Sequence, residues 1–210
     1  MSLTSEQNKH KIIDTTFLLS LKYGFDNVSI KQIKEESGLS TGTIYYYFKN
    51  KDEILEYMVK TYLTNSFYSY RDDIKNFEGT FIDKLRFTFE SKGNSFATKT
   101  KDDTPYVHSR PEFDHREYFM LFKSIYHFHP EVRGAFHRLN EKLHSFYYEL
   151  FQEAIDNGEI RDDVDAKTLA IYFQTSLKGY TDMWMFHPEF SFEEIVDSNI
   201  KMIEESLKKP

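Results

Sequence analysis

The chain has 210 residues, of which 40% are hydrophobic and 17% aromatic, and its formal net charge is −7. This length suits one large or two small domains, and this much apolar surface excludes an ordinary disordered chain. The absence of cysteine excludes disulfide scaffolds, Cys-ligated zinc and thiol catalysis, and no segment has the pattern of a membrane span or signal peptide, so a cytoplasmic protein without a membrane partner is expected.

Helical signals dominate the first part of the chain. A first helix is predicted over residues 5–23 from its apolar periodicity. A serine and a glutamine at the two ends of residues 29–32 have the spacing of a capping box, which opens a second helix that ends before Gly38. Ser40 is a good N-cap for a third helix, and acidic residues in the first turn favour a fourth over residues 52–70.

Five further helices are predicted over residues 80–90, 117–128, 130–156, 165–186 and 191–207. Residues 91–114 are polar and interrupted by glycine and proline, so they are predicted to form a loop with one short helix, which is a candidate mobile lid. No alternation typical of strands is present. The sequence therefore predicts an all-α protein of about nine helices.

Residues 29–51 read SIKQIKEESGLSTGTIYYYFKNK and have the pattern of a helix-turn-helix. Two short capped helices flank a turn, and Ile33, Leu39, Ile44 and Phe48 are spaced to pack together. This motif docks its second helix in the major groove of DNA. A plain helical hairpin inside a bundle is the alternative, but three consecutive tyrosines point about 100° apart on a helix, and a core would bury one or two of them.

The third helix has residue types that suit contact with a duplex. Small hydroxyl side chains stand at its start, where base edges are met, and Gly42 allows close approach. The tyrosines can reach phosphates and touch thymine methyl groups, and Lys51 can pair with a phosphate. Four lysines against two glutamates make residues 29–51 locally basic in an acidic chain.

These residues closely resemble the N-terminal region of the TetR (tetracycline-repressor) family. The resemblance runs from Ile12 to Leu55, and its most specific parts are Gly38, the Thr43-Ile44-Tyr45 core, Phe48 and Lys51. Two short segments, 129–133 and 157–165, also look like junctions of the family's variable ligand domain. Departures occur where the family usually has alanines or an aromatic residue, at Thr15, Thr16, Ser20, Lys34 and Ser37.

The resemblance implies a three-helix DNA-binding head in residues 1–51 and a ligand-binding, dimerising helical body in residues 52–210. It implies that bases face Thr41, Gly42, Thr43 and Tyr45, with Ser40 at the helix start. It also implies that the DNA backbone is held by Ser29, Lys31, Tyr46, Tyr47 and Lys51. Lys34, where the chain departs from the family, is expected to add a phosphate contact of its own. The expected partners are a pseudo-palindromic double-stranded operator, a small hydrophobic or aromatic effector and a second copy of the chain, with no cofactor.

The aromatic residues of the body have two interpretations, core or effector pocket, and both stay open. The candidate pocket residues are Phe89, Phe119, Phe122, Tyr126, Phe173, Tyr180 and Trp184. Apolar stripes on the last two predicted helices either close the monomer or form the family's intersubunit four-helix bundle. The candidate interface residues are Leu177, Tyr180, Trp184, Ile195, Asn199 and Ile203.

Other functions find less support in the sequence. The eight histidines lack a spacing that completes a metal site, so packed or exposed histidines are expected and no metal is predicted. No nucleophile–base pairing or phosphate-binding loop indicates an enzyme. A helical interaction module, or a nucleoid-type DNA-binding module without an effector, remains the alternative to an effector-controlled repressor.

Overall fold

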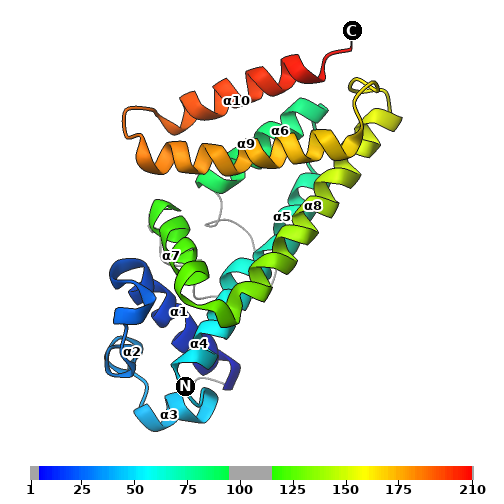
Figure 1. Cartoon of the computed structure of the whole chain (residues 1–210). Coiled ribbons are helices and arrows are strands. Elements are labelled where there is room, and N and C mark those ends of the chain that lie inside the picture. The colour runs from blue at the N-terminus through cyan, green and yellow to red at the C-terminus, as the bar shows by residue number, and fades with distance from the viewer. Residues whose placement is uncertain (1–4, 95–114, 210) are drawn as a thin grey trace. The chain divides into compact units, whose positions relative to one another are not determined.

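The computed structural model of the protein describes residues 5–94 and 115–209, and these form ten α-helices and no strand (Figure 1). The all-α prediction is therefore confirmed. The chain divides into two compact units, the first built from residues 1–66 and 97–137 and the second from residues 67–96 and 138–210. The domain boundary predicted after residue 51 stays a prediction.

The first unit holds the N-terminal helices together with a helix from the middle of the chain. Its elements are α1 (Ser5–Tyr23), the 3-10 turn η1 (Phe25–Asn27), α2 (Ile30–Ser37), α3 (Thr41–Tyr47), α4 (Lys51–Val59), the π turn η2 (Lys60–Thr64), α7 (His115–Phe128) and the 3-10 turn η3 (Pro130–Val132). Helix α1 is central, because it packs against α2, α3, α4 and α7.

Aromatic stacking joins three helices in the core of this unit. The ring of Phe17 on α1 stacks on Tyr62 of the π turn with 3.8 Å between centroids, and it also contacts two α7 rings, those of Tyr118 and Phe122. Tyr62 donates a 2.5 Å hydrogen bond to Asp14 Oδ1, and its carbonyl accepts one from the buried Tyr118 hydroxyl at 2.9 Å. Tyr62 therefore connects α1 with α7 through both its side chain and its backbone.

The π turn explains why ten helices replace the nine predicted. One continuous helix was expected over residues 52–70, but residues 60–64 widen so that Asn65 N–H donates to the Lys60 carbonyl, and α5 then runs from Ser66 to Lys75. Such a widened turn arises when packing favours inserting one residue into a helix. Buried positions recur every three or four residues up to Tyr62, and the next is Phe67, five residues further on. The sequence-based prediction of one continuous helix did not include this shift.

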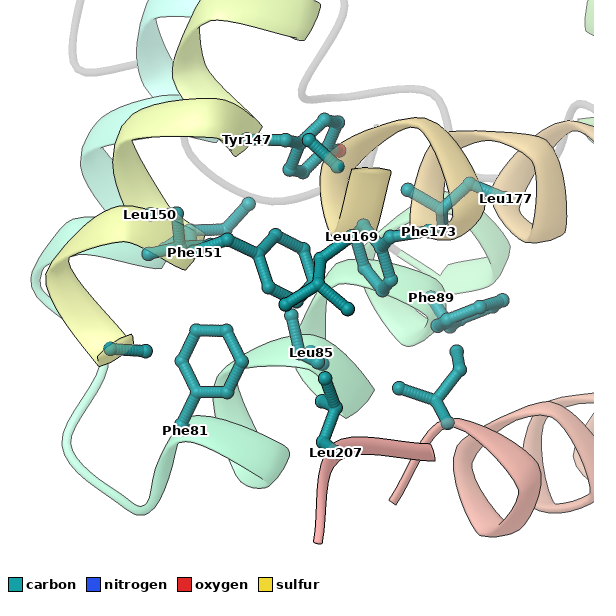
Figure 2. Packing of buried hydrophobic residues seen from close by; sticks show 14 of the residues in the cluster. Phe81, Leu85, Phe89, Tyr147, Leu150, Phe151, Leu169, Phe173, Leu177 and Leu207 are labelled. Atoms are coloured by element: carbon teal, nitrogen blue, oxygen red, sulfur yellow. The ribbon is translucent and has the colours of Figure 1, made fainter. Parts of the chain in front are cut away.

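The second unit is built from α5 (Ser66–Lys75), α6 (Phe81–Asn94), most of α8 (Arg133–Asp156), α9 (Ala166–Phe186) and α10 (Phe192–Leu207). Side chains from α6, α8, α9 and α10 converge in its core, where Phe81, Phe89, Phe151 and Phe173 lie close to one another (Figure 2). The Phe151 ring meets Phe81 and Phe173 edge-on, with centroids 5.2 and 5.6 Å apart. These contacts explain much of the chain's high aromatic content.

The predicted helix ends hold in this unit as well. Asp165 caps α9 by accepting from Thr168 N–H, and Ser191 opens α10 in a capping box with Glu194. Helix α8 ends before Gly158, which has a φ of 69°. Most of the loop predicted over residues 91–114 lies outside the described residues, although α6 extends to Asn94, four residues beyond its predicted end. None of the described helices is long and apolar enough to cross a bilayer.

Candidate DNA-binding surface

Local capping fixes the helix-turn-helix. The Ser29 hydroxyl accepts from Gln32 N–H while Ser29 N–H donates to the Gln32 side chain, which completes the predicted capping box of α2. Gly38 ends α2 in the left-handed conformation with φ 66°, where a side chain would add strain. Ser40 then caps α3 by accepting from Thr43 N–H. The local sequence therefore sets the turn between the two helices.

Helix α3 divides into an inner and an outer face. Ile44 is fully buried and Phe48 is 3% exposed, so these residues anchor the helix to the unit. Residues two positions from Ile44 project to the opposite side because successive residues of an α-helix are about 100° apart. Tyr46 is accordingly 80% exposed and Tyr45 50% exposed. The outer face of α3 thus consists of Thr41, Gly42, Tyr45 and Tyr46.

Most of the predicted DNA-contacting residues are accessible on this surface. Eight of them are exposed, and these are Ser29, Lys31, Lys34, Ser40, Thr41, Gly42, Tyr45 and Tyr46. Thr43, Tyr47 and Lys51 are half-buried. The predicted contacts with bases and phosphates themselves stay predictions.

The hydroxyls of Ser40 and Thr43 have partners within α3. They lie 2.8 Å apart, and Ser40 Oγ also accepts from the backbone N–H of Thr43. These two side chains therefore stabilise the start of α3, and their hydroxyls are less available to bases than the sequence suggested. The Thr41 hydroxyl and the two exposed tyrosines remain as polar groups of the outer face.

Lys51 is held by the first unit's own backbone. Its ammonium group donates to the Asp26 carbonyl at 3.0 Å and lies 4.4 Å from the centre of the Phe25 ring. Partial burial lowers the pKa of Lys51, although the carboxylates of Asp26 and Asp52 oppose that shift. Lys49, a residue outside the predicted contact set, is much more exposed and lies 3.9 Å from Glu53. It adds a second positive charge beside α3.

The first 51 residues differ in charge from the rest of the chain. Residues 1–51 contain seven lysines and five acidic residues, whereas the rest of the chain contains 20 basic and 29 acidic residues. The helix-turn-helix segment is thus positive in a protein whose net charge is −7. A local positive field of this kind suits the approach of a phosphate backbone.

The predicted effector-binding residues fall in both units. Phe119, Phe122 and Tyr126 belong to α7 in the first unit, where Phe122 is buried and Tyr126 bonds to His137 Nε2. The others, Phe89, Phe173, Tyr180 and Trp184, belong to the second unit.

Phe89, Phe173 and Tyr180 fill the core of the second unit. Phe89 lies 5.7 Å from Phe173 and 5.1 Å from Tyr180, measured between ring centroids, and the Tyr180 hydroxyl donates to the Phe89 carbonyl. This matches the core interpretation that the sequence left open. An open groove of about 500 Å³ in this unit, between the start of α6 and the end of α10, contains none of the predicted pocket residues.

The predicted dimer-interface residues also lie largely inside the second unit. Leu177, Tyr180, Ile195 and Ile203 are buried in the single chain, and Trp184 and Asn199 are half-buried. Their stripes thus close the unit, because α9 and α10 pack these faces against each other and against α6. Helix α9 carries a second apolar face, pointing outward, that the single predicted stripe does not include; it contains Ile171, Tyr172, Met183 and Phe186.

Several histidines have specific partners. His144 Nδ1 lies 2.9 Å from Gln174 Oε1, and the ring nitrogens of His129 lie 3.0 Å from Glu131 and 3.1 Å from Asp26. The described part of the chain contains no group of three or more potential ligands arranged for a metal ion.

A compact helix-turn-helix with a solvent-facing second helix, joined to a larger helical body, defines the class of helix-turn-helix DNA-binding proteins. Residues 12–58 match the family described as bacterial regulatory proteins, tetR family. The N-terminal region of the chain is thus that of a TetR-family transcriptional regulator, as its sequence resemblance implied.

Individual relatives agree with this placement. The HTH-type transcriptional regulator HbdR of Aromatoleum sp. (strain CIB) is 40% identical over 58 residues, which cover 28% of this chain but only 25% of that protein. A putative transcriptional regulator from Saccharomonospora viridis, solved in complex with choline, shares the fold with a TM-score of 0.74 at 18% identity, over 95% of this chain and 96% of that one. FadR from Bacillus subtilis, solved with stearoyl-CoA, gives a TM-score of 0.64 at 18% identity, over 92% and 96%.

Proposed function

We propose that the chain is a homodimeric transcriptional repressor that binds a pseudo-palindromic DNA operator and is released from it by a small hydrophobic or aromatic effector. The observation that carries the proposal is the division of α3 into a buried anchoring face and a solvent-facing surface of threonine, glycine and tyrosines. A hairpin that served only packing would bury more of those rings, because exposed aromatic surface contributes nothing to a core.

DNA binding can be tested directly by gel shift with the DNA that flanks the protein's own gene, at low and moderate salt. We expect a retarded band that an excess of unrelated duplex does not remove. Tyr45→Ala and Tyr46→Ala should each weaken this specific band with little loss of helical circular dichroism, because both side chains point away from the core. A chain that retards no duplex even at low salt would contradict the proposal.

Lys51 supplies a test of phosphate contact. Under the proposal, Lys51→Ala weakens binding to all duplexes alike and lowers the slope of log affinity against log salt by about one unit. Lys201→Ala, which changes an exposed lysine on α10, is the matched control outside the helix-turn-helix. Because Lys51 also bonds to the Asp26 carbonyl, the melting temperature of each variant must be measured in parallel. A loss of affinity with an unchanged salt slope would assign Lys51 a structural role only.

Dimerisation is supported by the outward face of α9, which we define as Ile171, Tyr172, Thr175, Gly179, Met183 and Phe186. Phe186 is 60% exposed and the four large apolar residues all exceed 40%. The Thr175 hydroxyl is bonded to the Ile171 carbonyl within the helix, which leaves its methyl group to face outward. A helix face with this much exposed apolar surface is typical of an interface. A dimer would also present two copies of α3, as specific recognition of a useful length of DNA requires.

An effector is supported by the ligands named for two proteins of the same fold. The Saccharomonospora viridis regulator was solved with choline and the Bacillus subtilis regulator with stearoyl-CoA, one a small cation and the other a long acyl thioester. The aromatic core of the second unit could accept an apolar group of either kind by repacking, and cations bind favourably over aromatic faces. Thermal-shift titrations with choline analogues and with acyl-CoA esters separate the two classes. If no compound of either class raises the melting temperature, the result counts against an effector of this description.

The rival function is a nucleoid-type module that binds DNA without sequence preference or effector. In that case Tyr45→Ala should leave the affinity for unrelated duplexes and for the flanking DNA equally unchanged. A specific repressor should lose its preference for the flanking DNA and keep the weak, salt-dependent affinity for other sequences.

A further inference from the structure

The outer face of α3 contains almost none of the groups that proteins use to read purines. The seven residues of α3, TGTIYYY, include no arginine, lysine, asparagine, glutamine or acid. Arginine and lysine are the usual readers of guanine, and asparagine and glutamine those of adenine. What α3 offers to a base edge is a threonine methyl group, two phenol rings with their hydroxyls and an uncovered glycine backbone.

The three amide side chains of residues 27–50 are already engaged in bonds within the first unit. Gln32 Oε1 accepts from Ser29 in the α2 capping box, Asn50 Oδ1 accepts from Glu53 N–H at the start of α4, and Asn27 Nδ2 donates to the Tyr23 carbonyl. Each of these bonds stabilises a helix end or a turn. These bonds fix the orientation of each amide for a role in the fold and leave it less free to turn toward an adenine.

The lysines of this region lie beside α3 and not on it. Lys31 is on α2, 3.9 Å from Glu35, and Lys49 follows the end of α3, 3.9 Å from Glu53. Lys51 donates to a backbone carbonyl. Flanking positions of this kind suit contact with phosphates, which carry no sequence information, better than contact with guanine in the floor of the groove.

Two adjacent lines of side chains form the outermost part of α3. Thr41 and Tyr45 are four residues apart and share one line, and Gly42 and Tyr46 share the next. A Cβ added at Gly42 would have only the Ser40 hydroxyl as a neighbour, at 3.7 Å, so packing within the protein does not demand glycine there. Because Gly42 has no side chain, the backbone is accessible at the start of α3. The two phenol rings project from the helix one turn later.

We infer that this face recognises thymine 5-methyl groups, so that the operator half-site is rich in A·T pairs and has thymines at the positions that α3 contacts. The inference rests on the proposed function and names the class of DNA that this surface fits. The 5-methyl group is the apolar feature of the major groove, and threonine methyl and aromatic carbon are its usual contacts. Guanine and cytosine would meet the same surface without a matching charged or amide partner.

The experiment has two arms that use the full-length protein. In the first, duplexes with a randomised central region are selected for binding and sequenced. In the second, each thymine of the selected half-site is replaced by deoxyuridine, which removes only the 5-methyl group. We expect A·T-rich half-sites, and about a fourfold loss of affinity for each contacted thymine that is replaced, as follows from burial of one methyl group.

Two variants identify the side chains responsible. Thr41→Ser removes the methyl group of Thr41 and keeps its hydroxyl, so one thymine of each half-site should lose its sensitivity to deoxyuridine. Lys31→Ala should weaken the thymine and deoxyuridine duplexes by the same factor, because a phosphate contact does not sense the base.

The outcomes separate this inference from the proposed function. Selected sites with fixed G·C pairs at the centre of each half-site, or specific binding that deoxyuridine leaves unaltered at every position, would overturn thymine recognition while DNA binding stands. Failure to select or retard any duplex would overturn the proposed function itself.

Discussion

Two glycines of the helix-turn-helix have opposite roles. Gly38 has a φ of 66° and forms the turn, whereas Gly42 lies in α3 with helical geometry and with room for a side chain. A methyl group is therefore strained at the first position and favoured at the second, because alanine is a better helix former than glycine.

We predict that Gly42→Ala raises the free energy of unfolding by up to about 1 kcal/mol and weakens binding to the operator. Gly38→Ala, the same chemical change four residues earlier, should lower that free energy by about 1–2 kcal/mol. Urea unfolding followed by circular dichroism measures the first quantity, and gel shift the second. Stronger DNA binding by Gly42→Ala would show that α3 does not approach a duplex at this point.

Tyr62 illustrates a residue whose importance the sequence does not reveal. It lies at the middle of the π turn and is 8% exposed. Its hydroxyl donates to Asp14, and its carbonyl accepts from the Tyr118 hydroxyl. Burial, and after it the charge of Asp14, raises the pKa of Tyr62 far above its usual range. A tyrosine among fifteen gave no sign of this role, because the contacts join residues 48 and 56 positions apart in the chain.

We expect Tyr62→Phe to destabilise the protein by about 1.5–3 kcal/mol, since it removes a hydrogen bond to a carboxylate and leaves that carboxylate one donor short. Combining it with Asp14→Ala, which removes the acceptor, in a double-mutant cycle isolates the pair. If the two single losses simply add, the bond contributes nothing of its own.

At the scale of elements, α9 shows where periodicity succeeds and where it fails. Its inner stripe of Phe173, Leu177 and Tyr180 follows from the sequence, which left open whether the stripe closes the monomer or forms a dimer. All three residues are buried within the single chain. The outer stripe runs along the opposite side of the same helix. A helix apolar on two faces satisfies more than one periodic pattern, so the sequence alone cannot tell which face meets its own chain.

The helix caps, by contrast, could be predicted to the residue. Ser29, Ser40, Asp165 and Ser191 all cap the helices expected of them. A cap depends on residues within three positions, and that information is entirely local. The π turn and the outer face of α9 depend on distant parts of the chain, or on a second chain.

Gly179 lies in the middle of the outer face of α9, and nothing within 4 Å would meet a side chain there. We predict that Gly179→Leu preserves or raises the melting temperature of the chain at low concentration but weakens dimerisation at least roughly tenfold, because a bulky group prevents two helices from approaching closely. Analytical ultracentrifugation measures the dimer. Lys178→Leu, an exposed neighbour at the edge of this face, is the matched control. If the Gly179→Leu variant dimerises as strongly as the unchanged chain, the interface does not lie on this face of α9.

For the whole molecule, buried phenols predict a limit to stability at high pH. Burial raises the pKa of five tyrosines, Tyr62, Tyr70, Tyr118, Tyr147 and Tyr180. The folded protein keeps these protons at a pH where the unfolded chain loses them, near about 10. The stability that they contribute is thus complete below about pH 10 and is lost as the pH rises further.

Each such tyrosine lowers the free energy of unfolding by about 1.4 kcal/mol per pH unit above about 10. We expect tyrosinate absorbance to rise in two stages, with the exposed Tyr68 in the first and the buried five in the second, together with the loss of helical circular dichroism. The hydrogen bond from Lys142 lowers the pKa of Tyr68, which places that residue in the first stage. Ionisation of the buried five together with Tyr68, with the helices intact, would contradict this assignment.

The separation of anchoring from reading on α3 has a consequence for how such a protein could acquire new targets. Ile44, Phe48 and the Ser40–Thr43 pair secure the helix, while positions 41, 42, 45 and 46 contribute little to that task. Those four positions could therefore be exchanged together, as a cassette, at small cost to folding. A transplanted set should redirect the chain to a different DNA sequence and leave the core of each unit unchanged.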